Sequence, residues 1–327
     1  MTGKGLDQVL VPATIPTIYF LGVTTARSSI LSVFPRWAEA LGIGSSRIVG
    51  IDLPPHAPAA NYRRVVAFIK GDALSRGALV TTHKIDCFQA ARDLFDAVDP
   101  LADLMGELSC LSKRDGRVVA SAKDPITGGL ALDAFVPAGH FARTGAEVFS
   151  MGAGGSTIAI TWHLMRKGRG VDRPSRIIVS NRSQPRLDEI ARIHREFDAG
   201  IPVSYVLAPR PEDNDKVMGD LKPGSLVINA TGLGKDAPGS PITDQGVFPE
   251  AGYAWELNYR GDLVFLRQAR AAAVHRPLTV EDGWVYFLHG WTRVIAEVFD
   301  RDIPTSGPVF DHLSELAGGR PALEAAS

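Results

Sequence analysis

The chain has 327 residues and a formal net charge of −1; 45% of its residues are hydrophobic and 22% are charged. That length suffices for two domains with a substantial core, and the composition is ordinary for a globular protein. The balanced charge excludes a strongly basic surface of the kind that attracts nucleic acid or an anionic membrane. No apolar run is long enough to span a bilayer. We therefore expect a cytoplasmic protein whose partner is a small molecule.

Neither end of the chain nor its cysteines point to secretion or metal binding. The first fourteen residues carry a lysine and an aspartate but no long apolar core, so they do not resemble a signal peptide. Cys87 and Cys110 are 23 residues apart, a spacing that matches no metal or redox motif. We predict two reduced thiols and no metal site. The tail 318–327, rich in Ala and Gly, predicts disorder.

Short apolar runs alternate with helical patterns between residues 16 and 125. The pattern predicts strands at 17–22, 47–53 and 77–81 and helices at 30–41, 62–70 and 88–95. This alternation is typical of a parallel or mostly parallel α/β sheet. The Gly- and Pro-containing segment 124–129 predicts a turn where the chain crosses into a second domain.

A glycine-rich turn opens the second half. The apolar run 148–151 leads into Gly152-Ala153-Gly154-Gly155-Ser156, and a helical stretch covers 158–167. A second apolar run, 176–179, follows. Strand, glycine turn, helix and strand form the unit that binds a dinucleotide. Its glycines let the backbone approach the pyrophosphate, and the helix N-terminus offers N–H groups and positive potential.

The residues after the second strand bear on the choice of cofactor. NAD sites usually place Asp or Glu there to bind the ribose 2′-hydroxyl, whereas this chain has Asn181 and Arg182. An arginine accommodates a 2′-phosphate instead, so we predict NADP rather than NAD. The alternative is a solvated arginine at a strand end. Further strands are predicted at 225–230 and 253–259, and helices at 263–273 and 284–298.

These elements predict an α/β fold with two α/β domains. Residues 1–125 would form the first domain. Residues 126–277 would form a Rossmann-type NADP-binding domain, with the cofactor at the carboxyl ends of its parallel strands.

Six motifs in fixed order indicate a family. They are Gly22–Ser28; Val80–Lys84; Lys123-Asp124; the nucleotide loops at Gly152–Gly155 and Asn181–Ser183, with Arg186 three residues on; Ile228–Thr231; and the closing pair Glu256–Tyr259 and Asp282-Gly283. Read together over about residues 18–300, they resemble the shikimate dehydrogenase family. The resemblance implies NADP-dependent oxidation of a ring alcohol. It also implies that residues 1–125, completed by C-terminal helices within 278–317, form the substrate-binding and catalytic domain, and it allows a monomer or a homodimer.

The resemblance assigns roles to individual residues. Lys84 and Asp124 match the catalytic pair, which moves the hydroxyl proton and orients the substrate. The substrate would contact Ser28, Thr81, Ser109, Tyr259 and His289. The cofactor would contact Gly152, Ala153, Gly154, Gly155, Ser156, Asn181, Arg182, Ser183, Arg186, Asn229, Thr231 and Gly283. From spacing alone, Lys84 fits a surface lysine at a helix start and Asp124 a turn residue.

The substrate loops depart from the family pattern. The opening loop at Gly22–Ser28 keeps Ser28, but Ile30 and Leu31 stand where the family has a second serine and a proline. In the loop Leu79–Lys84, which is one residue shorter than in the family, Leu79 replaces an asparagine. Loss of polar groups from a pocket that binds hydroxyls changes its selectivity. We therefore expect a different, less hydroxylated cyclic acid. His83 fits a buried structural histidine, although it could also lower the pKa of Lys84 or act in its place.

Two other functions remain open at this point. A relative of methylene-tetrahydrofolate dehydrogenase would join a similar lysine-bearing domain to a nucleotide domain, but the ordered motifs fit it poorly. A catalytically inactive NADP-binding regulatory protein would account for the altered loops, but such a protein would not need both Lys84 and Asp124.

Overall fold

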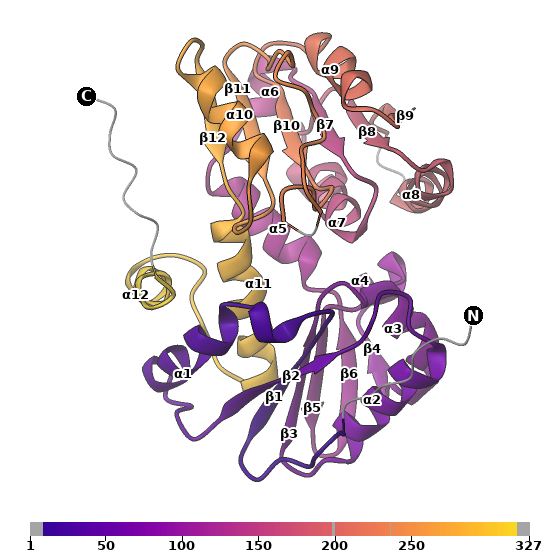
Figure 1. Ribbon diagram of the computed structural model, residues 1–327, viewed down its shortest axis with the longest axis vertical. Coiled ribbons are helices and arrows are strands. Elements are labelled where there is room, and N and C mark those ends of the chain that lie inside the picture. Colours follow the sequence, from indigo (N-terminus) through magenta and orange to yellow (C-terminus); the bar gives the residue numbers. More distant parts are fainter. Residues whose placement is uncertain (1–8, 198–199, 236, 319–327) are drawn as a thin grey trace. The chain divides into compact units, whose positions relative to one another are not determined.

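The computed structural model describes residues 9–197, 200–235 and 237–318 (Figure 1). Two compact units divide the chain. The first contains Met1–Lys123 and Gly290–Ser327, and the second contains Asp124–His289. Each has its own six-stranded sheet, so the predicted α/β class is confirmed. The predicted disordered tail lies outside the described residues, apart from Gly318. No helix in the described ranges is long and apolar enough to cross a membrane.

The first unit is built on a mixed sheet with the strand order β2-β1-β3-β5-β6-β4. Its strands are β1 (Thr17–Gly22), β2 (Arg47–Asp52), β3 (Ser75–Val80), β4 (Ala97–Val98), β5 (Cys110–Arg114) and β6 (Arg117–Ser121). The predicted parallel arrangement is confirmed for β1, β2 and β3, whereas β5 runs antiparallel to both its neighbours. The last three strands are not predicted by the sequence analysis.

A two-residue hairpin turn joins β5 to β6. Asp115 and Gly116 both have positive φ angles, 51° and 75°, and Arg114 pairs with Arg117 across the turn. An Asp-Gly pair is among the strongest short-range hairpin signals, because both central residues of this turn type need positive φ. The sequence therefore carries a signal for this hairpin that its apolar pattern does not.

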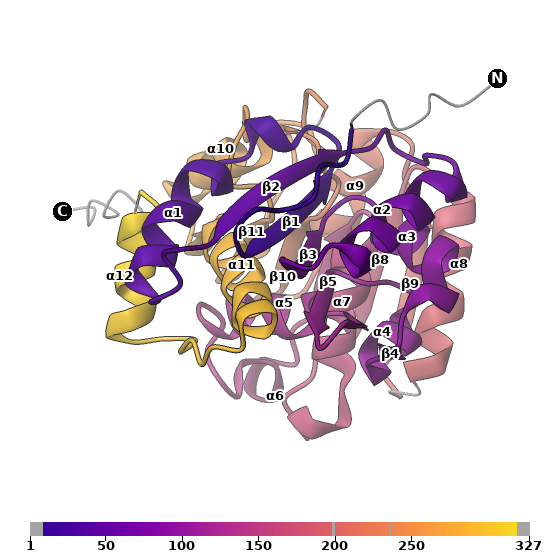
Figure 2. The same cartoon turned by 90° about the horizontal axis from the view of Figure 1, so that it is seen from below.

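Helices cover both faces of the first sheet. They are α1 (Ile30–Ala40), α2 (Ala59–Gly71), α3 (Lys84–Ala91), α4 (Pro100–Met105), α12 (Pro308–Leu316) and the end of α11 (Trp284–Phe299), with short 3-10 turns at Thr25–Arg27 and Arg92–Leu94. Figure 2 shows α2 and α3 on one face of the sheet and α1 and α11 on the other. Alternate residues of β1 therefore serve two cores. Leu21 packs in the cluster with α2, and the ring of Phe20 lies edge-on to Trp291, 5.1 Å between centroids.

The second unit is built on an entirely parallel sheet with the order β12-β11-β10-β7-β8-β9. Its strands are β7 (Val148–Met151), β8 (Ile177–Asn181), β9 (Val203–Leu207), β10 (Leu226–Asn229), β11 (Gly252–Glu256) and β12 (Leu278–Glu281). Numbered in chain order from β7, the strands lie in the sequence 3-2-1-4-5-6, which is the Rossmann order. The order in which successive strands are added reverses between β7 and β10, while all strands stay parallel. Dinucleotides bind outside the carboxyl ends of the strands at such a reversal.

The helices of the second unit are α5 (Asp124–Asp133), α6 (His140–Thr144), α7 (Gly155–Met165), α8 (Gln184–Phe197), α9 (Pro211–Gly219), α10 (Val264–Ala273) and the start of α11, with a 3-10 turn at Lys167–Arg169. The segment that returns to the first unit begins at Gly290, within α11. It begins later than residue 278, because Leu278–Glu281 is the edge strand β12.

The predicted turn at 124–129 is wrong, because these residues form the first turns of α5. Pro125 is tolerated there, since the first turn of a helix does not need its N–H. Gly128 and Gly129 face α7: a Cβ on Gly128 would lie 3.1 Å from Ile160, and one on Gly129 would overlap the ring of His163. The two glycines therefore allow close contact between helices rather than a turn.

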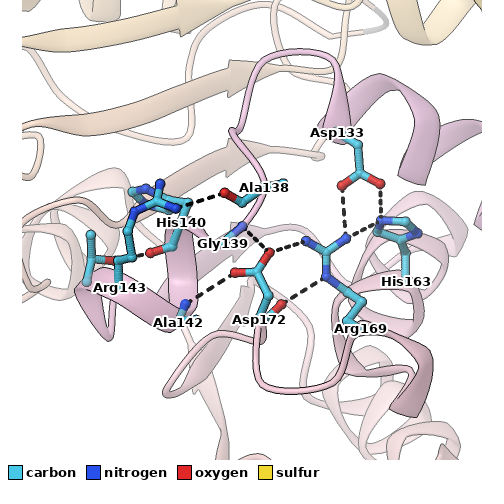
Figure 3. A network of polar contacts seen from close by, with 10 residues as sticks. Asp133, Ala138, Gly139, His140, Ala142, Arg143, His163, Arg169 and Asp172 are labelled. Carbon is cyan, nitrogen blue, oxygen red and sulfur yellow. Dashed lines mark hydrogen bonds and ion pairs between the residues drawn. The ribbon is translucent and has the colours of Figure 1, made fainter.

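A network of ion pairs fixes the far end of α5 (Figure 3). The carboxylate of Asp133 contacts His163 Nε2 at 3.1 Å and Arg169 Nη1 at 2.9 Å. Asp172 accepts a hydrogen bond from the backbone N–H of Gly139 at 2.8 Å. Although burial alone would raise the pKa of Asp133, the hydrogen bonds from His163 and Arg169 lower it below its ordinary value. The network ties α5 and α7 to the loops beside them.

Cys87 and Cys110 are free thiols, both buried in the first unit. Burial raises the pKa of each to about 12. Because the thiolate is the reactive form, both cysteines serve as packing residues.

Candidate functional site

The glycine turn after β7 lies against the end of β10. Gly152 has a φ of 105°, and a Cβ there would lie 2.6 Å from the carbonyl oxygen of Ala230. Its N–H donates to the carbonyl of Ser180 at the end of β8. A side chain at residue 152 would push these neighbouring strand ends apart. Glycine is therefore required where β7, β8 and β10 end together.

The next glycine lies in open space. Gly154 is the N-cap of α7 with an extended backbone, φ −101° and ψ −174°, and a Cβ there would meet no heavy atom of the described chain within 4 Å. Helix α7 also begins without a side-chain cap, as far as the described residues go. An uncapped helix N-terminus next to open space is the arrangement that binds a phosphate. Ala153, Gly155 and Ser156 complete this turn and begin the helix.

The residues after β8 differ in their exposure and in the contacts that they already make. Asn181 Oδ1 accepts a hydrogen bond from the backbone N–H of Arg182, and the Arg182 side chain is exposed at the strand end. Arg186 forms an ion pair with Glu189, 2.8 Å between Nη1 and Oε2. The backbone carbonyl of Ser183 accepts a hydrogen bond from the N–H of Leu187 in the first turn of α8. Arg182 is therefore the arginine better placed to meet a 2′-phosphate, and Arg186 would have to share its charge with Glu189.

A buried carboxyl links the ends of β10 and β11. Glu256 is fully buried and accepts hydrogen bonds from Asn229 Nδ2, Asn258 Nδ2 and the backbone N–H of Asn258, at 2.7, 2.7 and 2.9 Å. Asn229 Oδ1 in turn accepts from the hydroxyl and the N–H of Thr231. Burial raises the pKa of Glu256 to about 7. The sequence analysis names Glu256 only as part of a motif, because nothing in a single sequence pairs it with Asn229.

Three further predicted site residues lie on α11, directly before it or packed against it. Gly283 must be glycine, because a Cβ there would overlap the carbonyl of Leu257, and its N–H donates to the carbonyl of Asn258. Tyr259 packs on Phe287 with ring centroids 4.4 Å apart. His289 is 2% exposed on α11. Gly283 and Tyr259 thus lie near the end of β11, in the same part of the second unit as Asn229.

Asp124 is the first residue of α5 and is 7% exposed. Its Oδ2 accepts a hydrogen bond from the hydroxyl of Tyr286, at 3.4 Å. A carboxylate at a helix N-terminus is stabilised by the partial positive charge of the helix. The structure thus places Asp124 at a helix start rather than in a turn.

In the first unit, Lys84 begins α3 after a three-residue loop that follows β3. Its N–H donates to the carbonyl of Thr81, and its side chain is half-buried. Thr81 is bound to β1, since its N–H and its hydroxyl both donate to the carbonyl of Leu21. Gly22 makes this possible, because a Cβ there would lie 3.2 Å from the Thr81 hydroxyl. Lys84 and the opening loop therefore emerge at the same end of the first sheet.

The opening loop is held by a pair of residues that the sequence analysis does not identify. Asp52, at the end of β2, accepts hydrogen bonds from the N–H and the hydroxyl of Thr25 at 2.8 and 2.6 Å. A Cβ on Gly50 would overlap the Thr25 side chain. Ser28 follows, half-buried, and its N–H donates to the carbonyl of Thr25. An acidic residue at the carboxyl end of a strand was the available signal.

Ser109 holds the segment that leads to α5. It is 3% exposed, and its Oγ accepts a hydrogen bond from the N–H of Lys123 at 2.7 Å. The Lys123 ammonium lies 3.4 Å from Glu297 Oε2 on α11. The hydroxyl of Ser109 can still donate one hydrogen bond, so it could contact a ligand as well.

The structure agrees with the interpretation of His83 as a buried structural histidine. It is 1% exposed, and its Nδ1 lies 3.0 Å from the hydroxyl of Tyr62. The Tyr62 hydroxyl in turn donates to Asp86 at 3.4 Å. Burial lowers the pKa of His83 below its ordinary value. A buried, neutral His83 anchors the start of α3 to α2. Nowhere in the described ranges do three or more His, Cys, Asp or Glu side chains gather as a metal site.

Comparisons with known proteins agree with the two-unit architecture. No family model matches the sequence. Over 241 residues, 72% of this chain and 74% of the relative, the sequence is 29% identical to a shikimate dehydrogenase (NADP(+)) of Caulobacter vibrioides. Among solved structures, quinate dehydrogenase from Corynebacterium glutamicum in complex with NAD has a TM-score of 0.72 at 17% identity, covering 92% of this chain and 98% of that one. The chain has the shikimate dehydrogenase fold. The predicted resemblance to that family is confirmed.

A second solved structure has the same fold. The enzyme from Thermus thermophilus, solved in complex with NADP(H) and shikimate, has a TM-score of 0.66 at 22% identity, covering 93% of this chain and 99% of that one. Identity at this level establishes the fold alone. The roles of Lys84, Asp124 and the substrate-contacting residues therefore stay predictions.

Proposed function

We propose that this protein is an NADP-dependent oxidoreductase that acts on a ring alcohol or ketone of shikimate or a related cyclic hydroxy acid. The observation that carries the proposal is the glycine turn at Gly152–Gly155, placed at the reversal point of a Rossmann sheet. The ordered motifs in both units extend it from dinucleotide binding to the dehydrogenase reaction.

The residues present suit NADP. Gly152 keeps the strand ends together, Gly154 leaves room for the pyrophosphate, and the uncapped start of α7 offers N–H donors. Arg182 would bind the 2′-phosphate, because a guanidinium matches phosphate oxygens with several donors. Asn229 and Thr231 would border the nicotinamide at the end of β10. NADP, once bound, would supply the hydride acceptor or donor.

Two side chains would handle the proton and the substrate. Lys84 would hold the reacting oxygen of the substrate and take its proton as the alcohol becomes a ketone, a task that contributes roughly 10²–10⁴-fold in rate. Asp124 would orient the lysine and accept a hydrogen bond from a neighbouring substrate hydroxyl. Tyr286, which donates to Asp124, would fix the carboxylate.

The substrate would be less hydroxylated than shikimate. Leu79 is 6% exposed in β3, where its side chain offers no donor or acceptor. The Ser109 hydroxyl accepts the N–H of Lys123, so it offers a ligand its donor and one fewer acceptor site. Ser28 and Thr81 in the first unit, and Tyr259 and His289 in the second, would supply the remaining polar contacts. A pocket with fewer hydrogen-bonding groups favours a ligand with fewer hydroxyls, since unmatched buried polar groups are costly.

Initial rates test this proposal. Reduction of NADP and NAD is measured with shikimate, quinate and less hydroxylated cyclohexene carboxylates for wild type and Lys84→Ala. Lys70→Ala is the matched control, because Lys70 lies in the same unit and forms a surface ion pair with Asp96. We expect NADP-linked turnover that falls at least ~100-fold in Lys84→Ala and is unchanged in Lys70→Ala.

The substrate profile decides the finer statement. Turnover of shikimate as fast as that of an ordinary shikimate dehydrogenase would refute the altered pocket while keeping the reaction. Tight NADP binding with no turnover of any acid would instead favour a regulatory protein. Lys84→Ala with undiminished activity would remove the lysine from the mechanism.

A further inference from the structure

Glu256 lies at the point where the loops after β10 and β11 meet. It is fully buried, and its two oxygens have separate partners. Oε2 accepts from Asn229 Nδ2, whereas Oε1 accepts from the backbone N–H and the Nδ2 of Asn258. Three donors from two strand ends therefore converge on one carboxyl group.

The direction of each hydrogen bond is fixed by groups that can only donate. The backbone N–H of Thr231 lies 3.1 Å from Asn229 Oδ1, so the amide oxygen must face Thr231. The amide nitrogen of Asn229 must then face Glu256. The backbone N–H of Asn258 fixes the second oxygen of Glu256 in the same way. Both carboxyl oxygens therefore accept hydrogen bonds, and three donors facing one carboxyl group favour its ionised form.

The same contacts tie down three loops. Asn258 Nδ2 also donates to the carbonyl of Leu233 at 3.2 Å, which attaches the loop after β10 to the end of β11. The carbonyl of Asn258 accepts the N–H of Gly283, just before α11. Release of Glu256 would thus loosen the Thr231 turn and the Leu233 contact together.

Full burial opposes the ionised form that the network needs. Burial raises the pKa of Glu256 to about 7, although its three hydrogen bonds and the positive charge of Lys235 act in the opposite direction. Other titratable groups on the elements packed against β11 are Glu281 at the end of β12, Asp282 directly after it, Arg267 and Arg270 on α10, and Tyr253 on β11 itself. A pKa of about 7 puts the protonation of Glu256 in the neutral range, whereas its hydrogen-bond donors favour the carboxylate.

We propose that ionised Glu256 is a positioning residue for the cofactor: it holds the loops after β10 and β11 in the arrangement that receives the nicotinamide, and its protonation releases them. Glu256 acts through Asn229 and Asn258 rather than by touching the cofactor itself. The part that concerns the nicotinamide rests on the proposed function. The order of the loops does not, because it follows from the hydrogen bonds alone.

A charge exchange between the two partners tests the idea. In Glu256→Gln, the new amide nitrogen faces the amide nitrogen of Asn229, so two donors oppose each other. In the double variant Glu256→Gln/Asn229→Asp, the carboxylate at 229 accepts from the glutamine and from Thr231, so the donors and acceptors match again. Glu147→Gln is the control, because Glu147 is a buried glutamate just before β7, bound to Arg176.

Two readouts are measured from about pH 5.5 to about pH 8.5: the Kd of NADP, and the hydrogen exchange of the Thr231 and Leu233 amides without cofactor, corrected for its intrinsic pH dependence. In wild type and Glu147→Gln, we expect exchange to rise and NADP affinity to fall as the pH drops through 7. In Glu256→Gln, affinity should be about 10-fold weaker than in wild type at pH 8, and it should lose the fall that wild type shows through pH 7. The double variant should recover most of that loss at pH 8.

The outcomes separate the two hypotheses. Equal affinity, exchange and pH dependence in wild type and Glu256→Gln would overturn the role of Glu256. A double variant no better than Glu256→Gln would also overturn it, because matching the hydrogen bonds would then have no effect. If wild type bound no NADP at all, the proposed function would fail, while the exchange data would still decide whether Glu256 orders the loops.

Discussion

Gly152 and Gly154 belong to one turn but have opposite surroundings, so alanine should affect them differently. At Gly152, a φ of 105° is strained for any L-residue, which costs about 1–3 kcal/mol. The new Cβ would also lie 2.6 Å from the Ala230 carbonyl oxygen, and overpacking of this kind costs about 1–3 kcal/mol more. Gly152→Ala should therefore lower the free energy of unfolding by about 2–6 kcal/mol and weaken cofactor binding.

Gly154→Ala should leave stability nearly unchanged. The extended backbone suits alanine, and the methyl group would meet nothing within 4 Å in the described structure. The reduced freedom of the unfolded chain and the poorer N-cap nearly cancel, so the net change is below about 1 kcal/mol. The methyl group would, however, stand where the pyrophosphate must approach the backbone. The Kd of NADP should rise about 10-fold or more.

Urea unfolding and NADP titration of both variants check this pair of predictions. The reasoning requires an unstable Gly152→Ala and a stable Gly154→Ala that binds NADP poorly. A Gly154→Ala variant with wild-type affinity would show that the pyrophosphate does not bind at this turn. A Gly152→Ala variant as stable as wild type would show that the ends of β7 and β10 can separate at little cost.

Three further predictions concern other positions. Arg182→Gln should raise the Kd of NADP about 10-fold and leave that of NAD unchanged; equal losses for both would place the 2′-phosphate elsewhere. In urea unfolding, Gly129→Ala should destabilise the protein by about 1–3 kcal/mol, because the new Cβ overlaps His163. Gly290→Ala, in the interior of α11 with no described atom within 4 Å of the new Cβ, should stabilise it by about 0.5–1 kcal/mol. A stabilised Gly129→Ala would contradict the contact with His163. Burial lowers the pKa of His194 to about 4. The protein should therefore lose up to about 3 kcal/mol of its free energy of unfolding as the pH falls from about 6.5 toward 4. This loss should be smaller in His194→Gln.

Apolar pattern was enough to predict the strands that carry the site. β1 is a mostly apolar run that ends in Gly22, β7 is a mostly apolar run followed by Gly152, and α1 buries Phe34 and Trp37 at helical spacing. Such elements keep their local preference in the fold because burial and periodicity agree. The glycine turn could be predicted for the same reason, since it joins one such strand to an apolar helix.

Where composition and packing disagree, the sequence misleads. Gly128 and Gly129 suggest a turn, but their lack of side chains serves the contact between α5 and α7, which only the fold reveals. The Asp115-Gly116 hairpin shows the reverse, because its local signal is strong and only the apolar pattern on either side is weak. Local composition cannot distinguish a glycine that bends the chain from one that admits a neighbour.

The polar contacts that hold the site are long-range, which limits what one sequence can show. Thr25 and Asp52 are 27 residues apart, and so are Asn229 and Glu256. Each pair forms only because parallel strands bring their carboxyl ends together. An aspartate or glutamate at a strand end can be noted in advance, but its partner depends on strand order.

The interrupted first unit has a consequence for synthesis on the ribosome. The strands of its sheet are complete at Ser121, but Phe20 packs on Trp291, and Trp37 donates to the carbonyl of Leu313. Those partners are translated roughly 170 residues later, which at about 5–20 residues per second is on the order of 10 to 30 s. During that interval the second unit, continuous in sequence, can fold, while the parts of β1 and α1 that pack on α11 and α12 stay uncovered. The nascent chain is thus most exposed to aggregation just before its last two helices emerge.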